Sequence, residues 1–169
     1  MEITLPKDYP LVVLSCVILC IECFFTGFSI VPARMNAFNE KFMSQFDAEH
    51  EKHFPGEKPA VGGWPDDGNG RYSQKLSYKA WYDFNNAMRS HINFVESLPI
   101  VLGYLLIGGL VVPQYAYITG FVQVVTRVLY AVMYTKSGPN GRKAGAIIGA
   151  LTLYPLGFVA MVQLVRLLL

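Results

Sequence analysis

The sequence has few charged residues. Lys, Arg, Asp and Glu make up 15% of its 169 residues, whereas about 25% is typical of a soluble domain. Hydrophobic residues make up 53%, and the mean hydropathy is positive. This composition argues against an ordinary soluble domain and favours a membrane protein. The formal net charge is only +2 and the basic residues form no cluster, so no nucleic-acid partner is expected.

Cysteine is also scarce. Cys16, Cys20 and Cys23 all lie in one apolar run, at the i, i+4, i+7 spacing of a single helix face. Cys20 and Cys23 match the C-x-x-C pattern, but redox and zinc versions of that pattern belong to polar loops or active-site turns. Buried cysteines that act as small hydrophobic residues are the favoured interpretation. His50 and His53 are too few to form a zinc site, so no metal is expected.

Long apolar runs are abundant. A helix needs about 20 mostly apolar residues to cross a bilayer, and four segments qualify, at about residues 11–31, 87–112, 115–134 and 144–169. The first is longer than the roughly 7–15 residues of a signal-peptide core, so we interpret it as a retained span. The expected fold is all-α: one integral membrane four-helix bundle with an extended loop at 34–86.

The connections between these spans are unequal. Little more than Val112-Pro113-Gln114 separates the second from the third, which predicts an antiparallel hairpin. The segment TKSGPNGRK, residues 135–143, has the composition of a turn. The basic residues gather in the first and third connections, which predicts that both face the cytosol. The middle of the long loop, FPGEKPAVGGWPDDGNG, is rich in Pro and Gly and is not expected to be helical.

A few polar residues interrupt the apolar spans. Ionisable groups in a bilayer are costly and usually face the bundle interior or a watery cavity. Arg89, Asn93 and Glu96 have the i, i+4, i+7 spacing of one helix face, and His91 points elsewhere. The third span carries a second such face, formed by Arg127, Tyr130 and Tyr134.

Two interpretations of these residues remain open. They could form internal pairs such as Arg89–Glu96 and Arg127–Glu22 that hold the bundle together. Alternatively, they could bind a charged, water-soluble ligand while an apolar one arrives from the bilayer. Arginines outnumber carboxylates near these faces, and an excess of buried positive charge favours an anionic ligand.

The segment RSHINFVESLP, residues 89–99, resembles the R-x-H/Q-x-N-x-x-E-x-x-P motif of the membrane-associated proteins in eicosanoid and glutathione metabolism. RVLYAVMY (127–134), KDY (7–9) and PAR (32–34) strengthen the resemblance, which covers all four spans. Within the family, the sequence is most similar to the type-3 microsomal glutathione transferases.

The resemblance implies a homotrimer that binds glutathione between neighbouring subunits, on the cytosolic side. It also implies a membrane of the endoplasmic reticulum, with a mitochondrial membrane as the alternative. The residues that it assigns to glutathione are Arg34, Arg89, His91, Asn93, Glu96, Arg127, Tyr130 and Tyr134. The implied activity is that of a glutathione transferase or peroxidase.

The implied chemistry is activation of the glutathione thiol. A thiol with a pKa of about 8.5 is mostly protonated at neutral pH, and a nearby cation lowers that pKa. Arg142 in the third connection is the candidate cation. The thiolate then attacks a lipophilic electrophile or lipid hydroperoxide, so no enzyme nucleophile is needed.

The sequence departs from the family pattern in two places. Met35 stands where some relatives have a second arginine, and the first loop is longer than in compact members. Its aromatic residues suit a membrane interface or a protein partner. The alternative function is therefore that of a non-catalytic subunit of a larger membrane complex.

Overall fold

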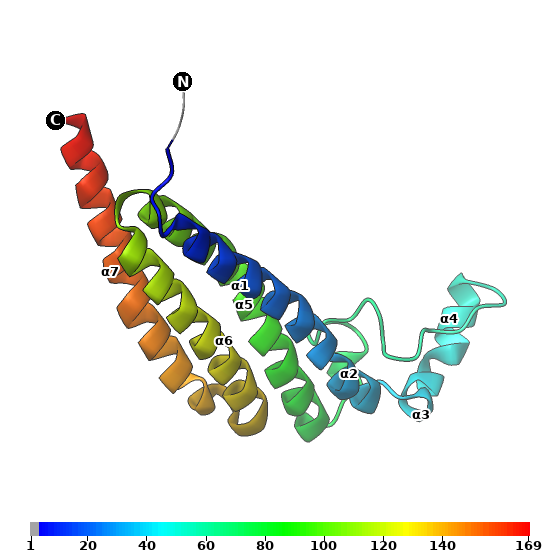
Figure 1. Ribbon diagram of the computed structural model, residues 1–169. Helices are drawn as coiled ribbons and strands as arrows, with labels where there is room; N and C mark the ends of the chain where they lie inside the picture. The colour runs from blue at the N-terminus through cyan, green and yellow to red at the C-terminus, as the bar shows by residue number, and fades with distance from the viewer. Residues whose placement is uncertain (1–3) are drawn as a thin grey trace.

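The structure is a computed structural model that describes residues 4–169, and helices are the only regular elements in that range. Four long helices lie side by side (Figure 1): α1 (Tyr9–Ser29), α5 (Tyr78–Val111), α6 (Pro113–Gly141) and α7 (Lys143–Leu168). Each is long and apolar enough to cross a membrane, with α1 continuing through the next short helix to Ala37. The expected all-α membrane bundle is confirmed: the protein is an integral membrane protein.

Helix is the structure that these apolar runs must adopt, because hydrocarbon offers the backbone no other hydrogen-bond partners. Proline occupies the first turn of α1 and of α6, where its missing N–H costs nothing. Val112 alone separates α5 from α6. These two helices therefore form the tight antiparallel hairpin seen in Figure 1.

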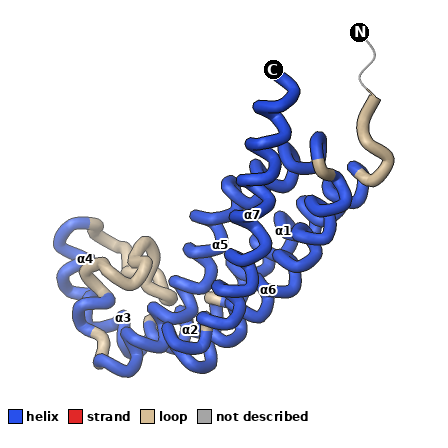
Figure 2. Tube along the Cα trace, turned by 90° about the vertical axis from the view of Figure 1, so that its left-hand side faces the viewer, coloured by secondary structure: helices blue, strands red, loops and turns tan. Residues whose placement is uncertain are grey.

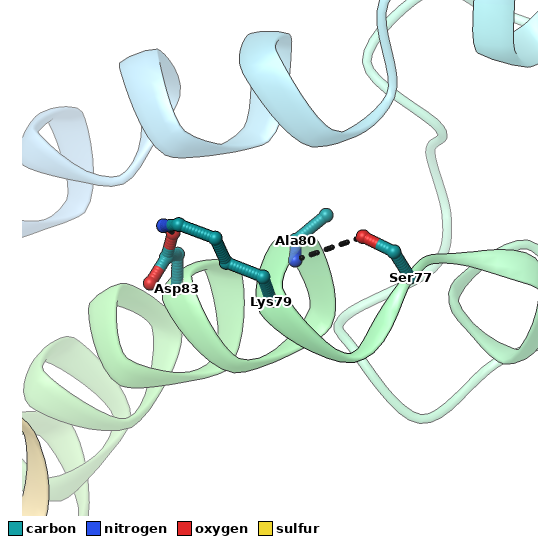
Figure 3. Close-up of polar contacts among 4 residues, drawn as sticks. All are labelled: Ser77, Lys79, Ala80 and Asp83. Carbon is teal, nitrogen blue, oxygen red and sulfur yellow. Dashed lines mark hydrogen bonds and ion pairs between the residues drawn. The ribbon is translucent and has the colours of Figure 1, made fainter.

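Helix α5 begins at Tyr78, well before the expected span boundary at residue 87. Its start is fixed by Ser77, whose hydroxyl accepts a hydrogen bond from the Ala80 amide at 3.3 Å (Figure 3). Lys79 and Asp83 then form an ion pair across one turn. These polar local signals start the helix outside the apolar run, so a search for hydrophobic length does not detect them.

Helix α6 also exceeds its expected span, running past residue 134 to Gly141 with a kink at Gly138. Gly138 has φ of 66°, which side-chain-bearing residues rarely adopt. A Cβ at this position would lie 2.7 Å from the Tyr82 hydroxyl. The predicted turn at residues 135–143 is thus a short break at Gly138–Pro139, after which α7 starts at Lys143.

Small residues bring the helices of the bundle close together. A Cβ added to Gly120 of α6 would lie 2.1 Å from the Ser15 hydroxyl of α1. A Cβ added to Gly145 of α7 would lie 2.7 Å from the Thr126 carbonyl oxygen of α6. Gly145 and Gly149, which share one helix face, therefore serve as a packing surface.

The segment between α1 and α5 contains short helices rather than a continuous loop. They are α2 (Val31–Ala37), α3 (Glu40–Met43) and α4 (Asp47–His53), with 3-10 turns η1 (Ser44–Phe46) and η2 (Ser73–Lys75). Residues 54–72 lack helix, as their composition predicts. Figure 2 shows α3 and α4 standing beyond the end of the bundle.

This segment has its own apolar core. Phe38 and Met43 pack with Phe84 of α5, all nearly inaccessible to solvent. Asp66 is 5% exposed and accepts hydrogen bonds from the amides of Gly68, Gly70 and Ser73 at 2.7–3.0 Å. We call residues 38–76 the loop-one unit, because these contacts give them a defined fold against α5.

Candidate functional site

A cavity of about 440 Å³ lies among α5, α6 and α7, near the turn that joins α6 to α7. Helix α5 contributes Asn93 and Ser97, and α6 contributes Gln123, Arg127 and Tyr130. Arg142, between α6 and α7, and Lys143, the first residue of α7, also line the cavity. We call this space the cationic cavity, because three basic side chains line it and no carboxylate does.

Arg127 and Asn93 connect the two polar helix faces predicted from the sequence. The Arg127 guanidinium donates a hydrogen bond to the Asn93 side-chain oxygen at 3.3 Å. It also lies 5.2 Å from the centre of the Phe94 ring, which it faces. Because Asn93 is neutral, it orients Arg127 without neutralising the charge.

Arg142 of the same cavity is held by two tyrosines. Its guanidinium donates a hydrogen bond to the Tyr130 hydroxyl at 3.2 Å and lies 5.3 Å from the centre of the Tyr134 ring. Both tyrosines are about 95% buried. The hydrogen bond to Tyr130 raises the pKa of Arg142 further above its ordinary value. Arg142 therefore keeps its charge wherever the protein is folded.

Gln123 and Thr126 also line the cavity, and the sequence analysis missed both. Gln123 is 1% exposed and its amide nitrogen donates hydrogen bonds to the Gly149 carbonyl at 2.7 Å and to Thr152 at 3.2 Å. Gln123 lies four residues before Arg127, on the same helix face. That spacing was the available signal, but an uncharged glutamine in an apolar run drew no attention.

The sequence suggested two ion pairs that would hold the bundle together, Arg89–Glu96 and Arg127–Glu22, and only the first forms among the described residues. Arg89 and Glu96 do approach each other, at 3.8 Å, but both side chains are about half exposed and neither lines the cationic cavity. The Arg127–Glu22 pair does not form in the described residues. Glu22 faces α6 at another position, and Arg127 bonds to Asn93 instead.

Arg34 and His91 lie away from the cationic cavity. They line a second cavity, of about 590 Å³, between α1, α5 and the loop-one unit. His91 makes a 2.8 Å hydrogen bond with the Thr26 hydroxyl. Arg34 is 6% exposed and donates to the carbonyls of Gly62 and Asp66 at 3.0 and 2.7 Å.

One guanidinium nitrogen of Arg34 keeps spare donor capacity. Nη1 makes both carbonyl hydrogen bonds, whereas Nη2 contacts only the sulfur of Met88, at 3.9 Å. The guanidinium carbon also lies 5.0 Å from the centres of the Trp64 and Phe84 rings. Arg34 therefore binds the loop-one unit to the bundle and still presents a cation to the second cavity.

The fold and the polar residues agree with a comparison against known families. A model described as MAPEG family, the family named above in full, matches residues 12–162, which is most of the chain and all four long helices. The chain belongs to the MAPEG family. MAPEG proteins include glutathione transferases and peroxidases, and also members without catalytic activity.

The candidate residues of this MAPEG chain lie in two separate cavities. Asn93, Arg127, Tyr130, Tyr134 and Arg142 come together around one cavity. Arg34 and His91 lie in the other cavity, between α1, α5 and the loop-one unit. The chain of this MAPEG protein thus divides the candidate residues between two cavities.

Proposed function

We propose that this protein is a glutathione-dependent membrane enzyme, a transferase or peroxidase that acts on a lipophilic electrophile or a lipid hydroperoxide. One observation carries the proposal: Arg127, Arg142 and Lys143 line one cavity with no carboxylate among its lining residues. Uncompensated cations in a half-buried site require an anion. Glutathione, with two carboxylates and an ionisable thiol, supplies that charge.

In this proposal, each glutathione site is completed by a neighbouring subunit of a homotrimer. One subunit provides the cationic cavity with Asn93, Arg127 and the two tyrosines. The neighbour provides Arg34 and His91 from its second cavity. The separation of these residues within one chain supports this arrangement, because no movement of a packed helix would bring them together.

Arg89 and Glu96 keep their proposed roles at the edge of this site. Their ion pair is half exposed and 3.8 Å long, so it contributes little stability and is easily exchanged for ligand contacts. Arg89 would take a glutathione carboxylate, and Glu96 the ammonium group or a backbone amide.

The proposed reaction uses Arg142 to stabilise the thiolate. The thiol proton leaves to solvent, and the sulfur forms a bond to the electrophilic carbon of an epoxide or activated alkene. The opened oxygen or carbanion then takes up a proton. With a hydroperoxide, sulfur attacks the terminal oxygen, the O–O bond breaks, and the lipid alkoxide leaves and takes up a proton from solvent to become the alcohol. A second glutathione then reduces the resulting sulfenic acid, which yields the disulfide and water.

Ultraviolet thiolate absorbance tests this proposal directly. Detergent-solubilised protein titrated with glutathione at neutral pH should develop thiolate absorbance, and Arg142→Ala should abolish that signal while glutathione still binds. Arg166→Ala, at the exposed end of α7, is the matched control. Failure of an intact oligomer to bind millimolar glutathione would overturn the proposal.

The loop-one unit favours a second candidate function. It is folded, packs on α5 through Phe38 and Phe84, and stands beyond the end of the bundle (Figure 2). Such a unit could dock on another membrane protein and make this chain a non-catalytic subunit. Isolation of a stable hetero-complex without transferase activity would support that function over the enzyme.

The resemblance of the sequence motifs to this family also suggests a subfamily and a membrane location. We propose that the chain is related to the type-3 microsomal glutathione transferases, and that it lies in the endoplasmic reticulum with loops one and three in the cytosol. Fluorescence microscopy of the tagged protein, with selective permeabilisation of the plasma membrane, would distinguish this location and orientation from a mitochondrial one.

A further inference from the structure

Thr26 of α1 and His91 of α5 are hydrogen-bonded to each other beside the second cavity. The Thr26 hydroxyl oxygen lies 2.8 Å from His91 Nδ1. The same hydroxyl lies 2.7 Å from the carbonyl oxygen of Cys23, one turn earlier in α1. His91 lines the second cavity, whereas Thr26 lies in a groove between α1 and α6. Thr26 therefore contacts His91 without itself lining the cavity.

These two contacts fix which nitrogen of His91 carries the proton. A hydroxyl group has one hydrogen, and a backbone carbonyl can only accept. The hydrogen of Thr26 must therefore point at the Cys23 carbonyl, and the Thr26 oxygen must accept the hydrogen of His91 Nδ1. In a neutral imidazole the other nitrogen, Nε2, then carries a lone pair instead of a proton.

The second cavity favours the neutral form of His91. Among the described residues that line it, Arg34 carries the only full charge and no carboxylate is present. A cation in a shared cavity disfavours a second positive charge. His91 Nε2 makes no hydrogen bond to any residue in the range 4–169. This nitrogen is thus an acceptor without a partner, in the same cavity as an arginine with spare donor capacity.

Gly27 leaves space beside the unpartnered nitrogen. A Cβ added to Gly27 would lie 3.4 Å from His91 Cε1 and 3.6 Å from His91 Nε2. These are ordinary van der Waals distances, so a methyl group would fit there but would occupy space next to Nε2. With glycine at this position, that space stays open to a ligand that lies in the cavity.

We propose that Thr26 is a positioning residue, which holds His91 Nε2 as a hydrogen-bond acceptor for a peptide N–H of bound glutathione. The inference rests on the proposed function. The lone pair of Nε2 repels the carboxylates of the ligand, which bind arginines such as Arg34. The ammonium group is disfavoured in a cavity that holds Arg34, and the thiol lies with Arg142 in the proposed reaction. The peptide N–H groups are the donors that remain.

Nitrogen NMR of the histidine rings tests the role of Thr26 without any ligand. The full-length protein, with isotope-labelled histidine, is studied in lipid nanodiscs at mildly alkaline pH, and His91→Gln identifies the His91 signals. The wild-type protein should show a protonated Nδ1 and an unprotonated Nε2. Thr26→Val should move the proton toward Nε2, the position that a free histidine side chain prefers. Thr26→Ser should keep the wild-type pattern, because it keeps the hydroxyl.

Calorimetry with glutathione and ophthalmate tests the assignment of the ligand donor, because ophthalmate carries a methyl group in place of the thiol. Thr26→Val and Gly27→Ala should each weaken both ligands about twofold to tenfold, the scale of one neutral hydrogen bond. Gly27→Ala should do so without changing the NMR pattern, and Thr26→Ser should bind like the wild type. Thr135→Val, which removes a similar hydroxyl-to-carbonyl bond from α6, is the control and should change neither result.

A protonated Nε2 in the wild-type protein, or a pattern that Thr26→Val leaves unchanged, would overturn the role of Thr26. Weaker binding of glutathione but not of ophthalmate would overturn the peptide N–H assignment, because the donor would then be the thiol. A protein that binds neither ligand would overturn the proposed function and the ligand assignment, whereas the NMR pattern would still decide the role of Thr26. The wild-type spectrum and Gly27→Ala keep the inference falsifiable if Thr26→Val does not assemble.

Discussion

The Arg142 guanidinium and the Tyr130 hydroxyl are joined by a 3.2 Å hydrogen bond across the junction between α6 and α7. The bond fixes a cation from a turn against a buried residue of a long helix. Precise placement of that cation matters, because its effect on a thiol falls steeply with distance. The same bond raises the pKa of Arg142, so in the proposed reaction pH should affect the glutathione thiol rather than Arg142.

Arg142→Ala should raise the pKa of bound glutathione and lower kcat by about a hundredfold, the scale seen when one charge-stabilising donor is removed. Arg142→Lys should recover part of this loss, because a cation returns without the planar geometry. The measurement is the pH profile of kcat with a small electrophile. A parallel loss of activity at every pH, with no shift of the profile, would contradict thiolate stabilisation.

Tyr130→Phe should release Arg142 without removing its charge. We expect kcat to fall about tenfold, the scale of one hydrogen bond to a charged group, with little change in the KM for glutathione. Combined with Arg142→Ala, the tyrosine substitution should have almost no further effect. Additive losses in the double variant would show that Tyr130 acts independently of Arg142.

Two inactive variants should complement each other if the site spans neighbouring subunits. Arg34→Met removes the contribution of one cavity, and Arg127→Met that of the other. Co-expressed with different tags and purified through both, the mixed oligomers should regain part of the wild-type activity. Mixtures that stay as inactive as either variant alone would indicate that each site lies within one chain.

Asp66 should make the loop-one unit sensitive to acid. Burial alone would raise the pKa of its carboxyl, but hydrogen bonds from Ser73, Gly68 and Gly70 outweigh burial and hold the folded-state pKa below the ordinary value of 3.8. A lowered folded-state pKa stabilises the fold above pH 3.8, and this contribution is lost as pH falls through the folded-state value.

Asp66→Asn should therefore lower the free energy of local opening by about 1–3 kcal/mol at pH 7. Amide hydrogen exchange in residues 66–76 should become correspondingly faster. The difference from wild type should shrink as both proteins are acidified below the wild-type pKa. Exchange measured by mass spectrometry at matched pH checks this. Unchanged exchange at pH 7 would refute the role of Asp66.

Gly120→Ala should destabilise the bundle by about 1–3 kcal/mol, because the new methyl group collides with Ser15 of α1. Ser15→Gly in the same chain should restore much of the loss. Gly103→Ala is the control, since a Cβ there meets no atom within 4 Å. The measurement is thermal unfolding in detergent, and equal melting temperatures of all variants would contradict this packing.

Much of the fold follows directly from hydrophobic length. Four apolar runs must become helices in a bilayer, and the single residue between α5 and α6 leaves only an antiparallel hairpin. The true ends of α5 and α6 did not follow, because Ser77 and Gly138 set them through local backbone chemistry outside the apolar runs. The loop-one unit was also hidden, since its core is completed by a contact between Phe38 and Phe84 of α5, which lie far apart in the sequence.

The candidate site was likewise predictable from the sequence only in part. Helical spacing alone placed Arg127 with Tyr130 and Asn93 with Arg89, because residues three or four apart share a helix face. Spacing could not show that Arg127 bonds to Asn93 rather than Glu22, nor that Arg34 lies in a different cavity. Those outcomes depend on how each helix is rotated against its neighbours, and close packing at Gly120 and Gly145 decides that rotation. The sequence thus determined which residues are polar and which helix carries them, and tertiary packing decided which cavity each one faces.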